Sequence, residues 1–139
     1  MVEFIQYAKE RKAIIYYDPN FRKAHAHEAI RLTPTVLDNL EYADIVRGSD
    51  EDFLNLFRKT DPANVYEENI KFYCHNFITT HGADGVNLYT DRFNGHYDSK
   101  PINAISTIGA GDNFNAGIIY GLLKYDVRYK DLQSLDKDT

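Results

Sequence analysis

The chain has 139 residues, of which 43% are hydrophobic and 14% aromatic, so it can build one core and needs no second domain. Its net charge is −5 without a long run of like charges, which argues against a nucleic-acid footprint or a polybasic membrane patch and leaves a small molecule as the expected partner. Cys74 is the only cysteine, which excludes an internal disulfide and a cysteine-based zinc cluster.

The first part of the chain alternates helix-like and strand-like segments. Residues 2–12 place apolar side chains at helical spacing, and the β-rich run at 13–18 ends at a Pro-Asn pair. Residues 27–43 are predicted to form a helix in two pieces, because Pro34 restricts the preceding residue and lacks a backbone donor. We therefore expect a helix, a strand and a broken helix in that order.

The middle of the chain repeats this alternation. Residues 44–49 are predicted to form a short buried strand, and residues 50–59 form the helix that follows it. Residues 63–76 are again helix-like, with three apolar residues expected in the core: Val65, Ile70 and Phe72. Two further strands, at 77–80 and 85–90, are separated by a tight connection that contains glycine. This order predicts an α/β fold with a mostly parallel sheet covered by helices, in which ligands bind at the carboxyl ends of strands.

The segment STIGAGDNFNAG, residues 106–117, places three small residues directly before an acid, and an apolar stretch follows. A helix that begins at Ala110 would point its free N–H groups outward together, where they and the helix dipole attract anions. Asp112 then has two interpretations. It is either an ordinary first-turn acid favoured by the dipole, or a carboxylate beside an anion site, as phosphoryl transfer to an alcohol requires.

This segment resembles the C-terminal signature of the PfkB (ribokinase-like) carbohydrate kinases. Three further segments resemble the family in the expected order: DPNFR at 18–22, ADIVRGSDEDF at 43–53 and TTHGADGV at 79–86. The resemblance covers most of the chain. It implies a ribokinase-like, Rossmann-like three-layer αβα fold and an ATP-dependent kinase that phosphorylates a primary hydroxyl of a sugar, with Mg²⁺ as a cofactor.

The resemblance also implies roles for single residues. Asp112 would be the general base that takes the proton from the sugar hydroxyl. The transferring phosphate would be held by backbone N–H groups of Gly109, Ala110 and Gly111. The residues that would contact ATP are Thr80, Gly82, Gly85 and Thr107.

Substrate and metal contacts are implied on two other segments. Arg22 and Asn20 would contact the sugar or the phosphate, although a turn capped by Asp and Asn after a strand explains the same letters. Where the family has N-x-x-E, this chain has Ser49 and Asp52, so Asp52 would organise Mg²⁺ with an acid that is one methylene shorter. Ser106 replaces the first Asp of the signature. In several members that Asp belongs to a loop that helps to hold a monovalent cation such as K⁺.

Family members are roughly twice as long as this chain, so residues 1–139 are interpreted as the C-terminal nucleotide-binding and catalytic portion, a partial domain. Fructose is the expected sugar, because DPNFR and SDED look most like fructokinases. A 2-keto-3-deoxygluconate kinase-like enzyme and a non-catalytic nucleotide-binding fragment stay open as alternatives. The sequence shows neither a signal peptide nor a membrane-spanning run, so we expect a cytoplasmic protein. A homodimer of the full-length enzyme is possible.

Overall fold

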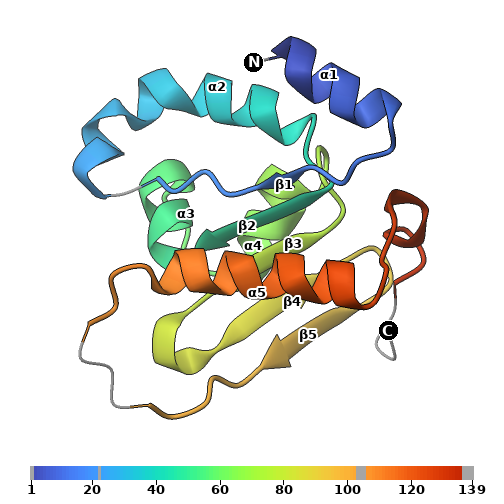
Figure 1. Cartoon of the computed structure of the whole chain (residues 1–139). Coiled ribbons are helices and arrows are strands. Elements are labelled where there is room, and N and C mark those ends of the chain that lie inside the picture. The colour runs from blue at the N-terminus through green and yellow to red at the C-terminus, as the bar shows by residue number, and fades with distance from the viewer. Residues whose placement is uncertain (1, 22, 103–105, 136–139) are drawn as a thin grey trace.

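The computed structural model describes residues 2–21, 23–102 and 106–135, and a five-stranded sheet forms its centre (Figure 1). The strands lie in the order in which they follow along the chain. The first three run parallel, and the last two add an antiparallel edge. They are β1 (Tyr16–Tyr17), β2 (Ile45–Ser49), β3 (Phe77–Thr80), β4 (Val86–Tyr89) and β5 (Asn94–Tyr97).

Helices cover both faces of this sheet, with α5 lying across one face in Figure 1. The helices are α1 (Val2–Glu10), α2 (Ala29–Leu40), α3 (Asp50–Phe57), α4 (Pro62–Val65) and α5 (Ala110–Lys124). A π-helical turn, η2 (Tyr66–Ile70), continues α4. Three short 3₁₀ turns complete the helical segments: η1 (Lys23–Glu28), η3 (Gly82–Asp84) and η4 (Tyr129–Asp131). In the part of the chain that the structure describes, no helix is both long and apolar enough to cross a membrane.

The central strands feed two separate cores. Val46 and Phe77 are fully buried on the face covered by α2, α3 and α4. Ile45 and Ile78 point to the opposite face, where they pack with apolar residues of α5. Because successive side chains of a strand point to opposite faces, a strand buried on both sides must be apolar at consecutive positions, as these are. The predicted three-layer αβα arrangement is confirmed.

The prediction of a two-piece helix around Pro34 was wrong. The helix α2 runs unbroken across Pro34. The proline removes only the bond to the carbonyl of Ile30, and both residues lie on the exposed side of the helix. The buried face, made by Ala29, Val36 and Leu40, is untouched.

Two other expectations need correction. Phe72 was expected in the core but is 88% exposed, because the helical segment ends at Ile70 and the chain turns there. Cys74 is fully buried instead. The strand β5 was not predicted, because it is short, polar and exposed at the edge of the sheet, and so lacks an apolar alternation.

Candidate functional site

The carboxyl ends of the three parallel strands and the start of α5 lie at the same edge of the sheet (Figure 1). Asp18 follows β1, the first turn of α3 follows β2, and Thr80 ends β3. Parallel strands bring the segments after them together, and α5 enters from a distant part of the sequence. The fold therefore brings the family-like motifs together at one edge. Their spacing along the chain does not show this.

Arg47, on β2, connects these segments. Its Nη1 donates to Asp18 Oδ2 at 2.9 Å and its Nη2 donates to Thr80 Oγ1 at 2.7 Å. Asn115 of α5 donates through Nδ2 to the same Asp18 oxygen at 2.8 Å, and its Oδ1 accepts from the Tyr16 hydroxyl at 2.9 Å. Burial raises the pKa of Tyr16, so this hydroxyl stays a neutral donor. One polar network thus links three strands to α5.

Neither Arg47 nor Asn115 was singled out from the sequence. The available indication was a charged residue inside the apolar run Ile-Val-Arg, one that a buried strand carries only when the charge is paired. The partners of Arg47 are 29 and 33 residues away along the chain, and Asn115 is 97 residues from Asp18. Local patterns do not reveal contacts at such separations.

The glycine-rich start of α5 has the geometry of an anion site. Gly109 caps the helix with φ at +79°, a left-handed conformation that glycine adopts at little cost. The N–H of Ala110 donates to the carbonyl of Thr107 at 3.1 Å, so it is engaged. The N–H of Gly111, in the first turn, has no earlier helical turn to bond. Asp112 follows it as an exposed acid in the same turn.

The loop after β3 divides into a bonded part and an open part. The Thr80 hydroxyl belongs to the Arg47 network. Gly85 has φ at +96°, and a Cβ there would lie 2.2 Å from the carbonyl oxygen of Tyr97, so packing alone requires glycine. Gly82, with φ at +54°, has no atom within 4 Å of the position that a Cβ would occupy, and it lies on an exposed turn.

The remaining predicted residues occupy turns and caps. The N–H of Asn20 donates to Asp18 Oδ1 at 3.0 Å, which is the Asp-Asn turn considered for this motif. Arg22 lies outside the described residues. Asp52 is 7% exposed, and its Oδ2 accepts from both the N–H and the hydroxyl of Ser49 at 2.7 Å, as part of a capping box on α3. Ser106 Oγ accepts from the N–H of Ile108 at 3.2 Å and so keeps a turn.

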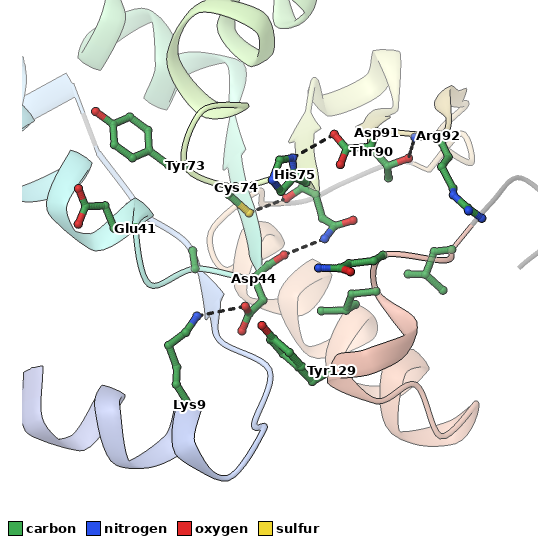
Figure 2. Close-up of a pocket in the computed structure, with 15 residues that line it drawn as sticks. Lys9, Glu41, Asp44, Tyr73, Cys74, His75, Thr90, Asp91, Arg92 and Tyr129 are labelled. Atoms are coloured by element: carbon green, nitrogen blue, oxygen red, sulfur yellow. Dashed lines mark hydrogen bonds and ion pairs between the residues drawn. The ribbon is translucent and has the colours of Figure 1, made fainter.

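A polar cavity of about 170 Å³ lies at the opposite end of the sheet (Figure 2). Here Lys9 Nζ donates to Asp44 Oδ1 at 3.3 Å, and His75 Nδ1 lies 3.0 Å from Asp91 Oδ1. Burial raises the pKa of the Cys74 thiol, which also lines this cavity, to about 11. The predicted site residues are at the other end, so we place the candidate site at the carboxyl edge.

Known proteins are similar to this chain in sequence. Probable fructokinase-6, chloroplastic, from Arabidopsis thaliana is 33% identical over 117 residues, which cover 81% of this chain and 30% of that protein. Fructokinase-2 from Solanum lycopersicum is 30% identical over 123 residues, which cover 83% of this chain and 35% of that protein. The chain therefore spans about a third of the length of these relatives.

A solved structure confirms the predicted ribokinase-like fold. Fructokinase from Vibrio cholerae O395, in its fructose-, ADP- and calcium-bound form, superposes with a TM-score of 0.76 and 28% identity, covering 87% of this chain and 39% of that one. The chain thus has the fold of part of a larger kinase domain. The family model of the pfkB family carbohydrate kinases matches residues 1–135, and the chain belongs to that family.

Proposed function

We propose that this chain is the nucleotide-binding and catalytic portion of an ATP-dependent, fructokinase-like sugar kinase. The observation that carries the proposal is the position of Asp112 in the first turn of α5, directly after the Gly109–Gly111 segment and at the carboxyl edge of the parallel strands. The named fructokinases among its relatives support fructose as the sugar. The sugar contacts then come largely from sequence beyond these 139 residues, because those relatives are about three times as long.

In this proposal Asp112 is the general base. Its carboxylate takes the proton of a primary sugar hydroxyl while that oxygen attacks the γ-phosphorus of ATP. The bond between the γ-phosphorus and the β–γ bridging oxygen breaks, and ADP leaves. The outward N–H groups at the start of α5 stabilise the negative charge on the transferring phosphoryl group. An exposed carboxylate suits this task, because it must reach a substrate that enters from solvent.

The nucleotide residues keep their predicted roles within the proposal. Gly82 offers accessible backbone to the phosphates or the ribose, and Gly85 shapes the same turn. Thr80 and Thr107 act near the triphosphate, Thr80 with its hydroxyl held by Arg47. Asn20 stays with the substrate side of the site, together with Arg22, whose place is outside the described residues.

Magnesium fits this site as part of MgATP. Among residues 2–21, 23–102 and 106–135 no cluster of three His, Cys, Asp or Glu side chains is placed to hold a metal ion. Mg²⁺ usually keeps several waters and takes phosphate oxygens with one or two carboxylates. Because Ser49 engages Oδ2 of Asp52, Asp52 would hold a bound ion indirectly, as a negative charge near it. When bound, the ion neutralises charge on the β- and γ-phosphates.

The proposal is tested in two steps. Titration of the 139-residue chain with ATP and with fructose is expected to show weak ATP binding and no fructose binding, because half a cleft cannot hold both substrates. The full-length protein is then assayed for ADP release with fructose and with 2-keto-3-deoxygluconate. Fructose-dependent ADP release supports the proposal. If neither sugar causes ADP release, the proposal is contradicted. If 2-keto-3-deoxygluconate is preferred, the assigned substrate becomes that sugar in place of fructose.

The same proposal includes a cytosolic enzyme that forms a homodimer. The single, buried thiol of Cys74 suits a reducing compartment. Cell fractionation and size-exclusion chromatography of the full-length protein test the two statements separately.

A further inference from the structure

We propose that Arg47 is a positioning residue that provides a positive charge beneath the phosphate site at the start of α5. The inference rests on the proposed function for the identity of the anion. It concerns a residue outside the family-like glycine motif, on β2 rather than on α5. Its basis is the burial of Arg47, its contacts and the charges around it.

Arg47 is too deeply placed for a surface ion pair. The residue is 6% exposed, and its partner Asp18 has a side chain that is 17% exposed. The two Nη atoms are bonded, but Nε is buried with no hydrogen-bond partner in the part of the chain that the structure describes. A buried donor left without a partner lowers the stability of the fold. A buried arginine with such a cost needs a reason beyond holding two loops together.

The guanidinium lies directly against the first turn of α5. A Cβ at Gly111 would be 3.0 Å from Nη1 of Arg47, and the Phe114 ring centroid is 5.4 Å from its Cζ. Close packing on Arg47 therefore favours glycine at position 111. It lets the helix start approach the cation closely enough for their charges to act together.

Two positive groups meet at the start of α5. A helix start carries a partial positive charge, so Arg47 adds a like charge to it. Two acids oppose this charge: Asp18, bonded to Arg47, and Asp112, exposed in the first turn. A phosphate at the N–H groups of that turn would face both positive groups, and Asp18 and Asp112 would oppose its binding. The cation and the helix start would then attract the same group.

An electrostatic role and a purely structural role of the Arg47–Asp18 pair predict different changes in anion affinity. If the pair only holds loops in place, removing either charge disturbs the site and weakens anion binding. If Arg47 acts through its charge, Arg47→Gln weakens anion binding and Asp18→Asn strengthens it. The opposite signs are the readout that a structural role does not produce.

The experiment titrates the 139-residue chain with tripolyphosphate at constant low ionic strength, without divalent metal, by calorimetry. We expect about tenfold weaker binding for Arg47→Gln and about threefold tighter binding for Asp18→Asn, since charges several ångströms from the anion act through partly buried protein. Arg47→Lys, which keeps the charge, should bind within about threefold of the parent. The matched control is Arg31→Gln, which removes an exposed arginine of α2 and should change binding less than about twofold.

Circular dichroism checks that each variant is folded, and if Arg47→Gln is not, Asp18→Asn and Arg47→Lys decide the question. Weaker binding in both Asp18→Asn and Arg47→Gln, unchanged binding in Arg47→Gln, or no tripolyphosphate binding by the parent chain would each overturn the role of Arg47. The expected pattern of signs without sugar phosphorylation by the full-length protein would instead overturn the proposed function and leave the role of Arg47 in place.

Discussion

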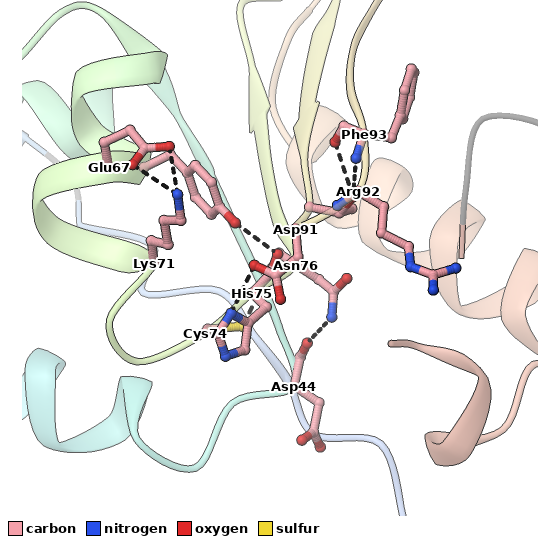
Figure 3. A network of polar contacts seen from close by, with 11 residues as sticks. Asp44, Glu67, Lys71, Cys74, His75, Asn76, Asp91, Arg92 and Phe93 are labelled. Atoms are coloured by element: carbon pink, nitrogen blue, oxygen red, sulfur yellow. Dashed lines mark hydrogen bonds and ion pairs between the residues drawn. The ribbon is translucent and has the colours of Figure 1, made fainter. Parts of the chain in front are cut away.

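Both ends of the sheet are polar, but their polar side chains have different hydrogen-bond partners. At the amino end, side chains bond the backbone. Asp44 Oδ2 accepts from the N–H of Ile15 at 2.8 Å. Asn76 Nδ2 donates to the carbonyl of Asp44 at 2.9 Å (Figure 3). At the carboxyl end, side chains bond one another around Arg47, beside a glycine-rich backbone. The first arrangement stabilises the fold, and in the proposed function the second lies beside the backbone donors that bind the phosphate.

The largest expected effect is at the carboxyl end. Under the proposed function, Asp112→Asn in the full-length protein should lower kcat by about 10²–10⁴-fold and leave ATP affinity within a few-fold, because the amide keeps the helix start but cannot accept a proton. Asp38→Asn, at an exposed position of α2, is the control and should leave kcat unchanged. A kcat for Asp112→Asn within tenfold of the parent would contradict the role of general base.

At the amino end, the prediction concerns reactivity rather than catalysis. Burial raises the pKa of the Cys74 thiol to about 11. At pH 8 the folded chain should therefore react with iodoacetamide about 100-fold more slowly than the same chain in urea, from ionisation alone. Reaction at similar rates in the two states would show that this end of the sheet opens freely.

The same thiol sets a pH dependence of stability. Because its pKa is raised in the folded state, its contribution is fully present below the ordinary thiol pKa and is lost as pH rises toward 11. The free energy of unfolding should fall more steeply with pH above neutrality in the parent than in Cys74→Ala. Parallel pH profiles for the two proteins would argue against the shift.

Two substitutions of Asp44 distinguish the contribution of its ion pair with Lys9 from that of its hydrogen bond with the Ile15 N–H. Asp44→Ala removes both the bond to Ile15 and the pair with Lys9, and should lower the free energy of unfolding by about 1–3 kcal/mol. Asp44→Asn keeps an acceptor for Ile15 and should cost about 1 kcal/mol or less. Urea unfolding measures both. Neither variant should change tripolyphosphate affinity. A change would show that the amino end of the sheet influences anion binding at the carboxyl end.

Sequence patterns predicted the elements better than the contacts between them. The strands β2 and β3 and the helix α5 were expected because apolar runs and a glycine-rich helix start are local features. The unbroken helix at Pro34 depended on which side of α2 faces solvent, and the network around Arg47 depends on partners far apart in the chain. Tertiary topology decides such features, and a single sequence does not display it.

The smallest expected effect compares two glycines of the same helix. In a helix, Gly→Ala alone stabilises by about 0.5–1 kcal/mol. Gly117→Ala should show this gain, because nothing lies within 4 Å of the added Cβ. Gly111→Ala should instead lower the free energy of unfolding by about 1 kcal/mol, since the Cβ would lie 3.0 Å from Nη1 of Arg47, which Asp18 holds in place.

A second background sharpens this comparison between glycines. Arg47→Gln shortens the side chain that crowds Gly111, so the difference between Gly111→Ala and Gly117→Ala should narrow in that background. Urea unfolding of the six proteins, the two parents and their four alanine variants, gives both differences. Equal effects of the two alanines in the Arg47 parent would show that the guanidinium yields easily, and that close packing on Arg47 is not what requires glycine at position 111.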